Sequence, residues 1–425
     1  MTSHKDDREL AVLRDRADPL ADFRRRFHIP LMDPGREKIY FCGNSLGLQP
    51  KTARNAVESI LRDWEERAVD AHFRGAEPWL TYHETVNTMM AEMVGALPGE
   101  VVLMNALTVN LHLLLISLYR PVGNRSGIAV EAGPFPSDLH ALHSHLTLHG
   151  VDPRQGLIAI APRPGESILR TEDMISFLKR EGERVALLLL GGVNFISGQY
   201  FEIAPIVRAA HASGILVGLD LAHAVGNVPL HLHDWDVDFA VWCSYKYLNA
   251  GPGSPGGCFI HERFRDRPDI PRLAGWWGEP ADRRFRMQPE FLPAPGARGW
   301  QVSNPSLLAL APLRASLEIF REAGTDRLRR KSRELTAYLF DLLAPFDPAL
   351  IECVTPPDPE QRGAQLTYRV QRNGRAVFEG LLAAGVVCDW REPGVIRLAP
   401  VPLYNTFEEV HACARAFEAI LRMNA

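Results

Sequence analysis

The sequence predicts an α/β fold in which a mostly parallel sheet lies between helices and a smaller α+β domain follows. From about residue 101, short apolar segments alternate with amphipathic ones. The strand candidates are GIAVEA, VALLLLGG, GILVGLD, DFAVWC and GGCFI, and the helix candidates are NLHLLLISL, SDLHALHSHLTL, TEDMISFLKRE and IAPIVRAAHAS. Strands that are apolar at every position are buried on both faces, which is typical of parallel sheets covered by helices. Gly214 is well placed to end the last of these helices.

The pattern changes near RGWQVSNP, at residues 298–305. After it come a long helix candidate at 306–324, a second charged helix, LTYRV, a helix at 376–384, VVCDWR, VIRLAPV and a last helix from about residue 406. A chain of 425 residues is too long for one compact core, so we expect two domains. We place a large domain at 61–300 and a small C-terminal domain at 301–425, joined by an N-terminal segment at 1–60.

That N-terminal segment has two parts. Up to about residue 35 it looks helical and charged, and Pro30 and Pro34 mark its exit. The stretch YFCGNSLGLQPK then predicts a short strand, a turn and the start of a helix, with Pro50 near the first helical turn.

Composition limits the classes of partner. The net charge is −4 with acids and bases interspersed, so we expect no nucleic acid and no anionic membrane as partner. No apolar run reaches the roughly 18–20 residues that span a bilayer, and the charged N-terminus lacks the apolar core of a secretory signal. Six scattered cysteines without a CxxC pair are typical of reduced core residues. We therefore expect a cytoplasmic location.

Two apolar runs end in residues that carry chemistry. ILVGLD ends in Asp220, and VDFAVWCSYKYLNAGPGSPGG places Lys246 between a strand and a glycine-rich turn. In open α/β sheets, ligands bind outside the carboxyl ends of the strands. A lysine and an aspartate at this edge are the pair that pyridoxal phosphate requires, because the lysine forms a Schiff base and the aspartate keeps the pyridine nitrogen protonated. A surface lysine and a helix-capping aspartate are the alternatives.

Other candidates surround this pair in the sequence. Thr108 begins an apolar helix, whose N-terminus is suited to a phosphate, although Thr108 also suits a simple cap. In FPSD, Phe135 would stack on a planar ring and Asp138 would approach its nitrogen, unless the segment is only a capped turn. His223, three residues after Asp220, lies beside the same ligand or is a buried core histidine.

Two histidine-rich stretches raise the question of a metal. They are DLHALHSHLTLHG, with His140, His143, His145 and His149, and HLHDWDVD, with His231, His233, Asp234, Asp236 and Asp238. Neither has the ligand spacing of a zinc site, so we predict no metal.

Two further sites have competing interpretations. Trp276 and Trp277 lie between glycines and serve either as a core or interface anchor, or as indole donors and ring walls near a ligand. Arg397, in VIRLAPVPLYN, suits bidentate recognition of a substrate carboxylate, and an inter-domain salt bridge is the alternative.

Taken together, the motifs resemble those of the kynureninases, which are fold-type I pyridoxal-phosphate hydrolases. The resemblance runs from about residue 40 to residue 407 and is carried by YFCGNSLGLQPK, LMNALTVNLHLLL, GPFPSD, GGVNFISGQYF, GLDLAHAVGNVPLHLHDWDVDFAVWCSYKYLNAGPGS, LAGWWG, RGWQVSNPSLLAL and IRLAPVPLYNTF. It implies a seven-stranded, mostly parallel sheet in the large domain.

The resemblance also implies a role for each matching residue. Lys246 is the cofactor-binding and proton-transferring lysine, and Tyr245 is a catalytic proton relay that also contacts the phosphate. Around the cofactor the resemblance places Leu107, Thr108, Phe135, Asp138, Asp220 and His223 of one subunit, with Trp276 and Asn304 of the neighbouring subunit. For the substrate it implies Arg397, Ser45, His72 and Asn304. The active site would thus lie at the interface of a homodimer.

The implied reaction is hydrolysis of the Cβ–Cγ bond of an amino acid with an aryl-keto side chain. Kynurenine, 3-hydroxykynurenine or a ring-modified analogue would give an anthranilate and L-alanine, in tryptophan catabolism, NAD biosynthesis or a derived pathway. His72 and Asn304 match relatives that prefer the 3-hydroxylated substrate, so we expect that preference. Trp277 stands where phenylalanine is common and Gly191 where relatives can have serine, and a bulkier ring at 277 could shift selectivity.

Two alternative functions remain. A cysteine desulfurase or selenocysteine lyase shares the fold and the aspartate–lysine pair, but has a histidine before the lysine, where this chain has Tyr245, and a reactive cysteine on a mobile loop. A non-catalytic cofactor-binding regulator would be expected to have lost Lys246, Asp220 or Arg397, and all three are present.

Overall fold

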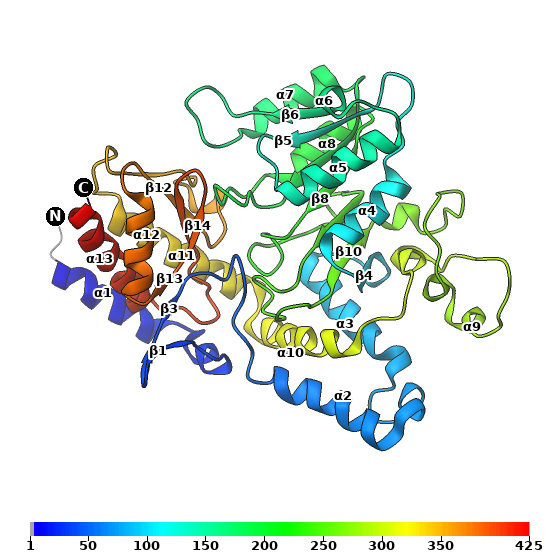
Figure 1. The fold of residues 1–425 in the computed structure, drawn as a ribbon, viewed down its shortest axis with the longest axis horizontal. Helices are drawn as coiled ribbons and strands as arrows, with labels where there is room; N and C mark the ends of the chain where they lie inside the picture. Colours follow the sequence, from blue (N-terminus) through cyan, green and yellow to red (C-terminus); the bar gives the residue numbers. More distant parts are fainter. Residues whose placement is uncertain (1–3, 425) are drawn as a thin grey trace.

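The structure, a computed structural model, describes residues 4–424 and contains two main sheets. Figure 1 shows the larger sheet with its helices as one body, and the smaller sheet with both ends of the chain as a second body beside it. This arrangement agrees with the expected combination of a large α/β domain and a small α+β domain.

The large sheet has seven strands and is mostly parallel, as expected. Its order is β4 (Val101–Met104), β10 (Gly256–Ile260), β9 (Phe239–Trp242), β8 (Leu216–Asp220), β7 (Val185–Gly191), β5 (Gly127–Glu131) and β6 (Leu157–Ile160). Only β10 runs antiparallel to its neighbours, β4 and β9. All five strand candidates from the sequence form strands of this sheet, and β4 and β6 complete it.

Helices cover both faces of this sheet. One face carries α4 (Leu107–Leu118) and α5 (Pro136–Leu148), and the other carries α3 (Trp79–Val94), α7 (Thr171–Glu181), α8 (Ile203–Ala212) and α10 (Leu307–Ala323). Successive strand residues point to opposite faces. Leu187 of β7 therefore packs with the buried side chains on the face of α4 and α5, and Leu188 packs with those on the other face. Burial on both faces therefore explains the uninterrupted apolar runs.

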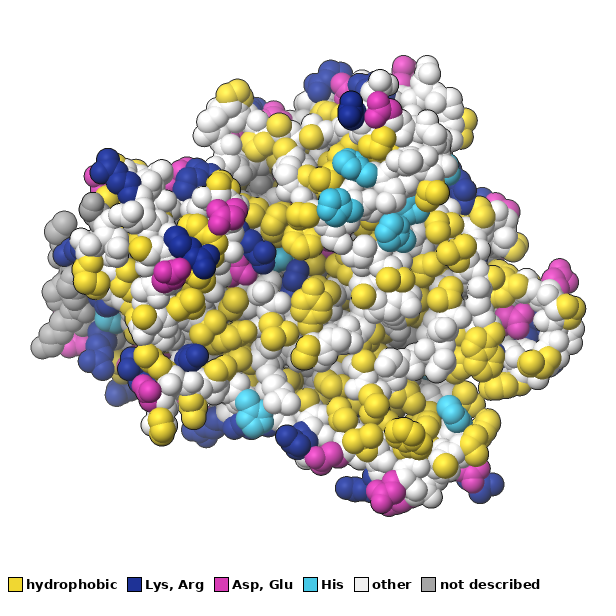
Figure 2. Space-filling view, viewed as in Figure 1, with side chains coloured by type: hydrophobic (Ala, Val, Ile, Leu, Met, Phe, Trp, Pro, Cys, Tyr) yellow, Lys and Arg dark blue, Asp and Glu magenta, His cyan; other side chains and the backbone are white. Residues whose placement is uncertain are grey.

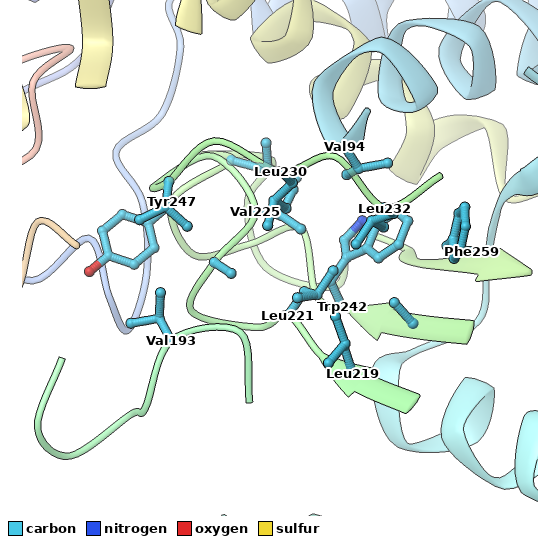
Figure 3. Close-up of a cluster of buried hydrophobic side chains, with 14 of the residues drawn as sticks. Val94, Val193, Leu219, Leu221, Val225, Leu230, Leu232, Trp242, Tyr247 and Phe259 are labelled. Carbon is cyan, nitrogen blue, oxygen red and sulfur yellow. The ribbon is translucent and has the colours of Figure 1, made fainter. Parts of the chain in front are cut away.

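The second face is held by a packed group of side chains from several segments (Figure 3). Trp242 of β9 lies there with Leu219 of β8 and with Leu232 from the loop between these strands. All three side chains are fully buried. This packing fixes the end of β8, where Asp220 lies, and the end of β9, which Lys246 follows.

The small sheet is antiparallel, in the order β11 (Ile351–Cys353), β12 (Leu366–Val370), β15 (Val395–Leu398) and β14 (Asp389–Arg391). Its helices are α11 (Thr325–Leu343), α12 (Gly374–Ala383) and α13 (Phe407–Asn424). The N-terminal segment docks here, because α1 (His4–Ala17) packs on α13 and β3 (Ile39–Tyr40) pairs in parallel with β13 (Val386–Val387). Asp18, just after α1, forms a buried 2.7 Å ion pair with Lys331 of α11.

The N-terminal segment is less helical than expected. Helix α1 ends at Ala17, two residues before Pro19, and only a short 3-10 turn follows at Ala21–Arg26. Proline disfavours helical conformation in the residue before it, which accounts for this early stop. The strands β1 (Leu31–Asp33) and β2 (Arg36–Glu37) then form a hairpin within the segment that was expected to be helical.

Packing bears on where the large domain ends. Helix α10 packs on α3 and on α2 (Ala53–Arg67), and its apolar side chains belong to the buried cluster of the large sheet. We expected the boundary at residue 301; we now propose that it lies between α10 and α11, and that α2 belongs with the large domain. Within residues 4–424, no helix is both long and apolar enough to cross a membrane.

Candidate active site

The site lies at the carboxyl ends of β8 and β9. These strands are parallel neighbours, and Asp220, the last residue of β8, is in register with Val241 of β9. Lys246 follows β9 by four residues, so both side chains reach the same sheet edge. They line one cavity of about 230 Å³, together with Tyr245, Phe135 and Asp138. The topology thus brings together five residues that the sequence placed at one ligand.

Lys246 sits between two aromatic rings. Its Nζ lies 5.9 Å from the ring centre of Phe135 and 6.0 Å from that of Tyr245. The loop before α2 crosses this segment closely, since the Gly47 amide donates to the Tyr245 carbonyl at 2.8 Å. A Cβ at Gly47 would lie 2.3 Å from the Lys246 carbonyl oxygen, so only glycine fits there.

Asp138 and Asp220 form a carboxyl pair. Burial, followed by the charge of Asp220 and a hydrogen bond with it, raises the pKa of Asp138 to about 10. Asp220 Oδ1 also accepts from the Ala222 amide at 2.8 Å, so it makes a local turn contact as well as lining the cavity. Asp138 Oδ1 is buried without a hydrogen-bond partner. Asp138 therefore keeps its proton at neutral pH, beside the Asp220 carboxyl group that lines the same cavity.

Sequence reasoning missed a third acid in this cavity. Glu131 is the last residue of β5, is 6% exposed and lines the cavity. Burial raises its pKa to about 7, although hydrogen bonds from Asn194 and the Gly191 amide oppose the shift. The sequence contained a signal for Glu131, because this residue ends an apolar strand just as Asp220 does.

Two helix N-termini also line the cavity. Leu107 and Thr108 begin α4, and Ser137 lies in the first turn of α5. The Thr108 and Ser137 hydroxyls are 2.7 Å apart and all three residues line the cavity. Free amides and the positive ends of two helix dipoles suit a phosphate group. Ser137 is a second residue that the sequence did not single out.

His223 and Phe195 line the side of the cavity. Burial, and then the charge of Lys246, lowers the pKa of His223 well below its usual range, so this imidazole is neutral near pH 7. Its Nδ1 is buried without a hydrogen-bond partner. Phe195 makes an edge contact with Phe135, with ring centres 5.3 Å apart.

Arg397 approaches the site from β15 of the small domain and is 1% exposed. It forms a 2.8 Å ion pair with Asp389 of the neighbouring strand, and its Nη1 donates to the Phe195 carbonyl at 2.6 Å. The ion pair therefore lies within the small sheet, and the contact between domains is a hydrogen bond. Arg397 is not among the residues that line the cavity around Lys246.

The remaining candidates lie elsewhere. A separate apolar hollow contains His72, Trp276, Trp277 and Asn304 and shares no residue with the cavity around Lys246. Trp276 is 48% exposed, whereas Trp277 is buried with an unpartnered indole N–H. Figure 2 shows hydrophobic side chains gathered at the lower right, over the segment that joins α2 to α3. Within one chain, these residues do not meet Lys246.

Ser45 occupies the turn before Gly47. Its amide donates to the Cys42 carbonyl at 3.0 Å, and its side chain is half-buried. It does not line the cavity around Lys246, although its turn touches the lysine loop.

The histidine-rich stretches are distributed over different surroundings. The first lies on α5, where Figure 2 shows a group of histidines, and His145 Nε2 is 3.0 Å from His112 Nδ1. In the second, His233 lies with Glu100 and His261, and their potential ligand atoms are within 4.8 Å of one another. The Glu100 carboxylate already accepts from two backbone amides and contacts His233. The absence of a metal stays a prediction.

The residues around Lys246 fit pyridoxal phosphate. An amine, a carboxyl pair, a ring and two helix N-termini match its aldehyde, its ring nitrogen, its ring face and its phosphate. The buried, unpartnered atoms Asp138 Oδ1 and His223 Nδ1 are polar groups that such a ligand would satisfy.

Comparison with known proteins first gives the class. Residues 39–255 match the aminotransferase class-V family. The cystine C–S lyase C-DES, solved with its product cysteine persulfide, superposes with a TM-score of 0.74 at 18% identity and covers 90% of this chain and 97% of its own. Cysteine desulfurase from Thermococcus onnurineus also gives 0.74 at 18% identity, covering 95% and 98%. The fold and the site thus define a fold-type I pyridoxal-phosphate enzyme.

Sequence relatives give the family. Residues 328–417 match the kynureninase C-terminal domain. A kynureninase from Koribacter versatilis is 51% identical over 411 residues, which is 97% of each chain. One from Xanthomonas campestris pv. campestris is 53% identical over 407 residues, covering 95% of this chain and 96% of its own. The chain belongs to the kynureninase family.

Proposed function

We propose that this protein hydrolyses the Cβ–Cγ bond of L-kynurenine or 3-hydroxy-L-kynurenine, or of a ring-modified analogue, giving an anthranilate and L-alanine. The observation that carries the proposal is the cavity that joins Lys246 to the carboxyl pair, in a chain with kynureninase relatives along nearly its whole length. Pyridoxal phosphate, when bound, supplies an electron sink for the carbons next to the substrate amine.

Several residues of the cavity have a role in this proposal. Lys246 holds the cofactor and moves the proton of the substrate α-carbon. Asp220 and Asp138 hold the proton of the ring nitrogen, and Thr108, Ser137 and the amide of Leu107 hold the phosphate. Phe135 stacks on the ring and His223 contacts the cofactor through its free nitrogen.

Tyr245 is proposed to move a proton at the substrate γ-carbonyl, where water adds. Burial raises the pKa of its phenol to about 12, so at neutral pH it is a proton donor. The ring centre of Tyr245 lies 6.0 Å from Lys246 Nζ, which keeps both groups at one substrate. A positioned general acid or base of this kind contributes roughly 10²–10⁴-fold to the rate.

Arg397 is proposed to bind the substrate carboxylate. Its guanidinium is buried beside Phe195, a residue of the cavity wall, and Nη2 makes no hydrogen bond of good geometry. Such a donor suits an incoming carboxylate. We also propose Ser45 as a substrate contact, because its turn lies against the lysine loop.

The assembly is proposed to be a homodimer with the active site at the subunit interface. The hollow with Trp276 and Asn304 is apolar, partly exposed and separate from Lys246. In a two-fold dimer this surface would meet the cavity of the second copy, so that Trp276 and Asn304 complete its cofactor site and His72 and Asn304 line its aryl pocket.

Two finer points belong to the proposal. We propose a preference for 3-hydroxykynurenine, set by His72 and Asn304 and modified by Trp277. Comparing turnover of kynurenine, 3-hydroxykynurenine and a ring-methylated analogue tests this preference, and faster hydrolysis of plain kynurenine would contradict it.

We also propose a cytoplasmic location, supported by six cysteines that are all free, and a place in tryptophan catabolism or a derived pathway.

The alternatives have less support. The desulfurase-like structures share only the fold at 18% identity. Cys243 lines the cavity, but burial raises the pKa of its thiol, and burial raises that of Cys42 to about 11. Such thiols are poor nucleophiles at neutral pH. The regulator alternative does not require the lysine, acid and arginine that this chain has.

An anthranilate-release assay tests the proposed function. Purified protein with pyridoxal phosphate should release fluorescent anthranilate from kynurenine or its 3-hydroxy form, and Lys246→Ala should lose both this release and the visible absorbance of the bound cofactor. Absorbance without release would favour the regulator. Release of sulfur and alanine from cysteine, with no anthranilate, would favour the desulfurase.

A further inference from the structure

One turn connects Glu131, in the cavity wall, with Arg397. Asn194 begins this turn, and its Nδ2 donates to Glu131 Oε2 at 2.7 Å. The Asn194 Oδ1 accepts from the Ile196 amide at 3.0 Å and from the Ser197 amide at 2.8 Å. A single side chain therefore fastens the turn to a carboxyl group of the cavity.

The other side of the same turn faces the small domain. The Phe195 carbonyl accepts from Arg397 Nη1 at 2.6 Å. The Ile196 carbonyl accepts from Gln365 Nε2 at 3.0 Å and from Thr367 Oγ1 at 2.6 Å. These contacts join segments far apart in the sequence, so the turn is a main point of contact between the two domains at the site.

We propose that Asn194 and Glu131 are positioning residues that set the direction of Arg397. Asn194 and Glu131 hold the turn and so place the Phe195 carbonyl. This carbonyl and Asp389 together fix the plane of the guanidinium toward the substrate carboxylate. The inference rests on the proposed function, in which Arg397 binds that carboxylate.

Two acceptors are enough to fix the orientation of the Arg397 guanidinium. A guanidinium is planar and its donors form a rigid fork. The Asp389 carboxylate accepts from Nε at 3.2 Å and lies 2.8 Å from Nη2 without a hydrogen bond of good geometry, and the Phe195 carbonyl accepts from Nη1. Moving the carbonyl would rotate the plane and redirect the donors left for substrate.

Gly191 makes room for the acid that anchors this chain of contacts. A Cβ at Gly191 would lie 2.8 Å from Glu131 Oε1, so any side chain there would force the carboxyl group to move. The glycine is therefore matched to Glu131, and Glu131 to Asn194.

Asn194→Ala is the first test, made on the holoenzyme. L-Alanine, the product with a carboxylate, and ethylamine, which lacks one, are titrated separately against the absorbance of the bound cofactor. We expect the dissociation constant of L-alanine to rise roughly tenfold, as for a lost hydrogen bond to a charged group, and that of ethylamine to stay within about twofold. The KM for kynurenine should rise more than kcat falls.

Further variants separate positioning from general damage. Glu131→Ala should give the same selective loss, and the double variant should lose no more than either single one, because both act through one contact. Asn194→Ser keeps a short acceptor for the turn but loses the donor to Glu131, and it replaces Asn194→Ala if that variant does not fold.

Asn405 provides a matched control. Its Nδ2 donates to Glu409 at 2.9 Å and its Oδ1 accepts from the Val401 amide at 2.7 Å, so it is a buried asparagine with the same two kinds of bond away from the cavity. Asn405→Ala should lower the melting temperature and leave the ratio of the two dissociation constants unchanged.

Arg397→Ala tests the proposed role of Arg397 separately from the positioning role of Asn194 and Glu131. If it keeps the preference for L-alanine over ethylamine, the proposed role of Arg397 is wrong. If it loses that preference but the Asn194 and Glu131 variants keep it, or weaken both ligands equally, the positioning role is overturned and the proposed role of Arg397 stands.

Discussion

Asp138 and Asp220 place two interacting carboxyl groups in one cavity. Two carboxyl groups in contact cannot both ionise at low cost, and burial adds to this cost. Asp138 therefore keeps a proton beside Asp220 at neutral pH. This effect of Asp220 on the pKa of Asp138 was not evident from the place of Asp138 in FPSD.

Asp138→Asn should change the pH dependence of stability. The folded protein keeps the Asp138 proton up to a pKa of about 10, whereas an ordinary aspartate releases it near 3.8. The folded state therefore binds more protons in this window, and the stability of the cofactor-free protein falls as pH rises through it. The amide that replaces the carboxyl group has no proton to lose, so the variant should melt higher than the parent at neutral pH.

Melting temperatures of the cofactor-free proteins at about pH 5 and about pH 8, both inside that window, check this. The gap between variant and parent should widen at the higher pH. Asp234→Asn, at an exposed aspartate, should follow the parent at both. An unchanged gap for Asp138→Asn would contradict the proton-sharing pair.

Single residues were predictable where a strand end marked them. Asp220 and Lys246 follow apolar strands, and the structure places both in one cavity. Glu131 also ends an apolar strand, but it was overlooked because no motif surrounded it. The Arg397–Asp389 ion pair was not predictable, because it depends on the register of β14 and β15 across a turn.

At the scale of elements, the N-termini of α4 and α5 act together. Each brings free amides, and the hydroxyls of Thr108 and Ser137 meet between them. Ser137→Ala should weaken binding of pyridoxal phosphate by roughly tenfold or more, since hydrogen bonds to charged groups contribute about 1.5–3 kcal/mol. Absorbance titration of the cofactor-free protein measures this.

Ser144→Ala is the matched control, because Ser144 is on the same helix, is exposed, and bonds to the His140 carbonyl away from the cavity. Its cofactor affinity should equal that of the parent. Equal affinity of the Ser137 variant would show that Ser137 does not contact the phosphate.

The N-terminal segment is tied to α11 by the buried pair of Asp18 and Lys331, whose side chains are 4% and 6% exposed. Lys331→Met leaves a buried charge without its partner, so we expect a loss of roughly 3–5 kcal/mol in stability. Urea unfolding followed by circular dichroism measures it. Adding Asp18→Leu should restore part of the loss.

The exposed pair of Arg375 and Glu379 is the control, with both side chains 61% exposed. Arg375→Met should change stability by less than about 1 kcal/mol. A similar small change for Lys331→Met would mean that the buried pair does not hold the segment.

Most elements of the large domain were predictable, because burial on both faces gives strands a distinct composition. Strands β4 and β6 are short and were not singled out. The N-terminal hairpin was missed because its two strands are very short, and Pro30 and Pro34 predicted only the exit of a charged helical segment.

At the scale of the molecule, the apolar hollow is separate from the cavity around Lys246, and we propose that a second chain completes the site. If Asn304 serves the partner's cavity, then Asn304→Ala and Lys246→Ala impair different halves of one site. Mixing the two inactive proteins under conditions that exchange subunits should restore roughly a quarter of the parent activity, since half the dimers are mixed and each has one intact site.

Lys246→Ala mixed with Tyr245→Phe is the control, because both changes lie in the same half and no intact site can form. Anthranilate release before and after exchange measures the recovery. No recovery in the first mixture, with exchange confirmed by mass spectrometry, would place Asn304 outside the partner's site. The sequence alone predicts such an interface only through resemblance, since partner surfaces leave no periodic pattern.

The docking of α1 (His4–Ala17) on α13 (Phe407–Asn424) has a consequence for synthesis. The first helix leaves the ribosome long before the helix on which it finally rests. The large domain is complete much earlier and folds as a unit while translation continues. Helix α1 therefore meets the helix on which it packs only after most of the residues between them have been made.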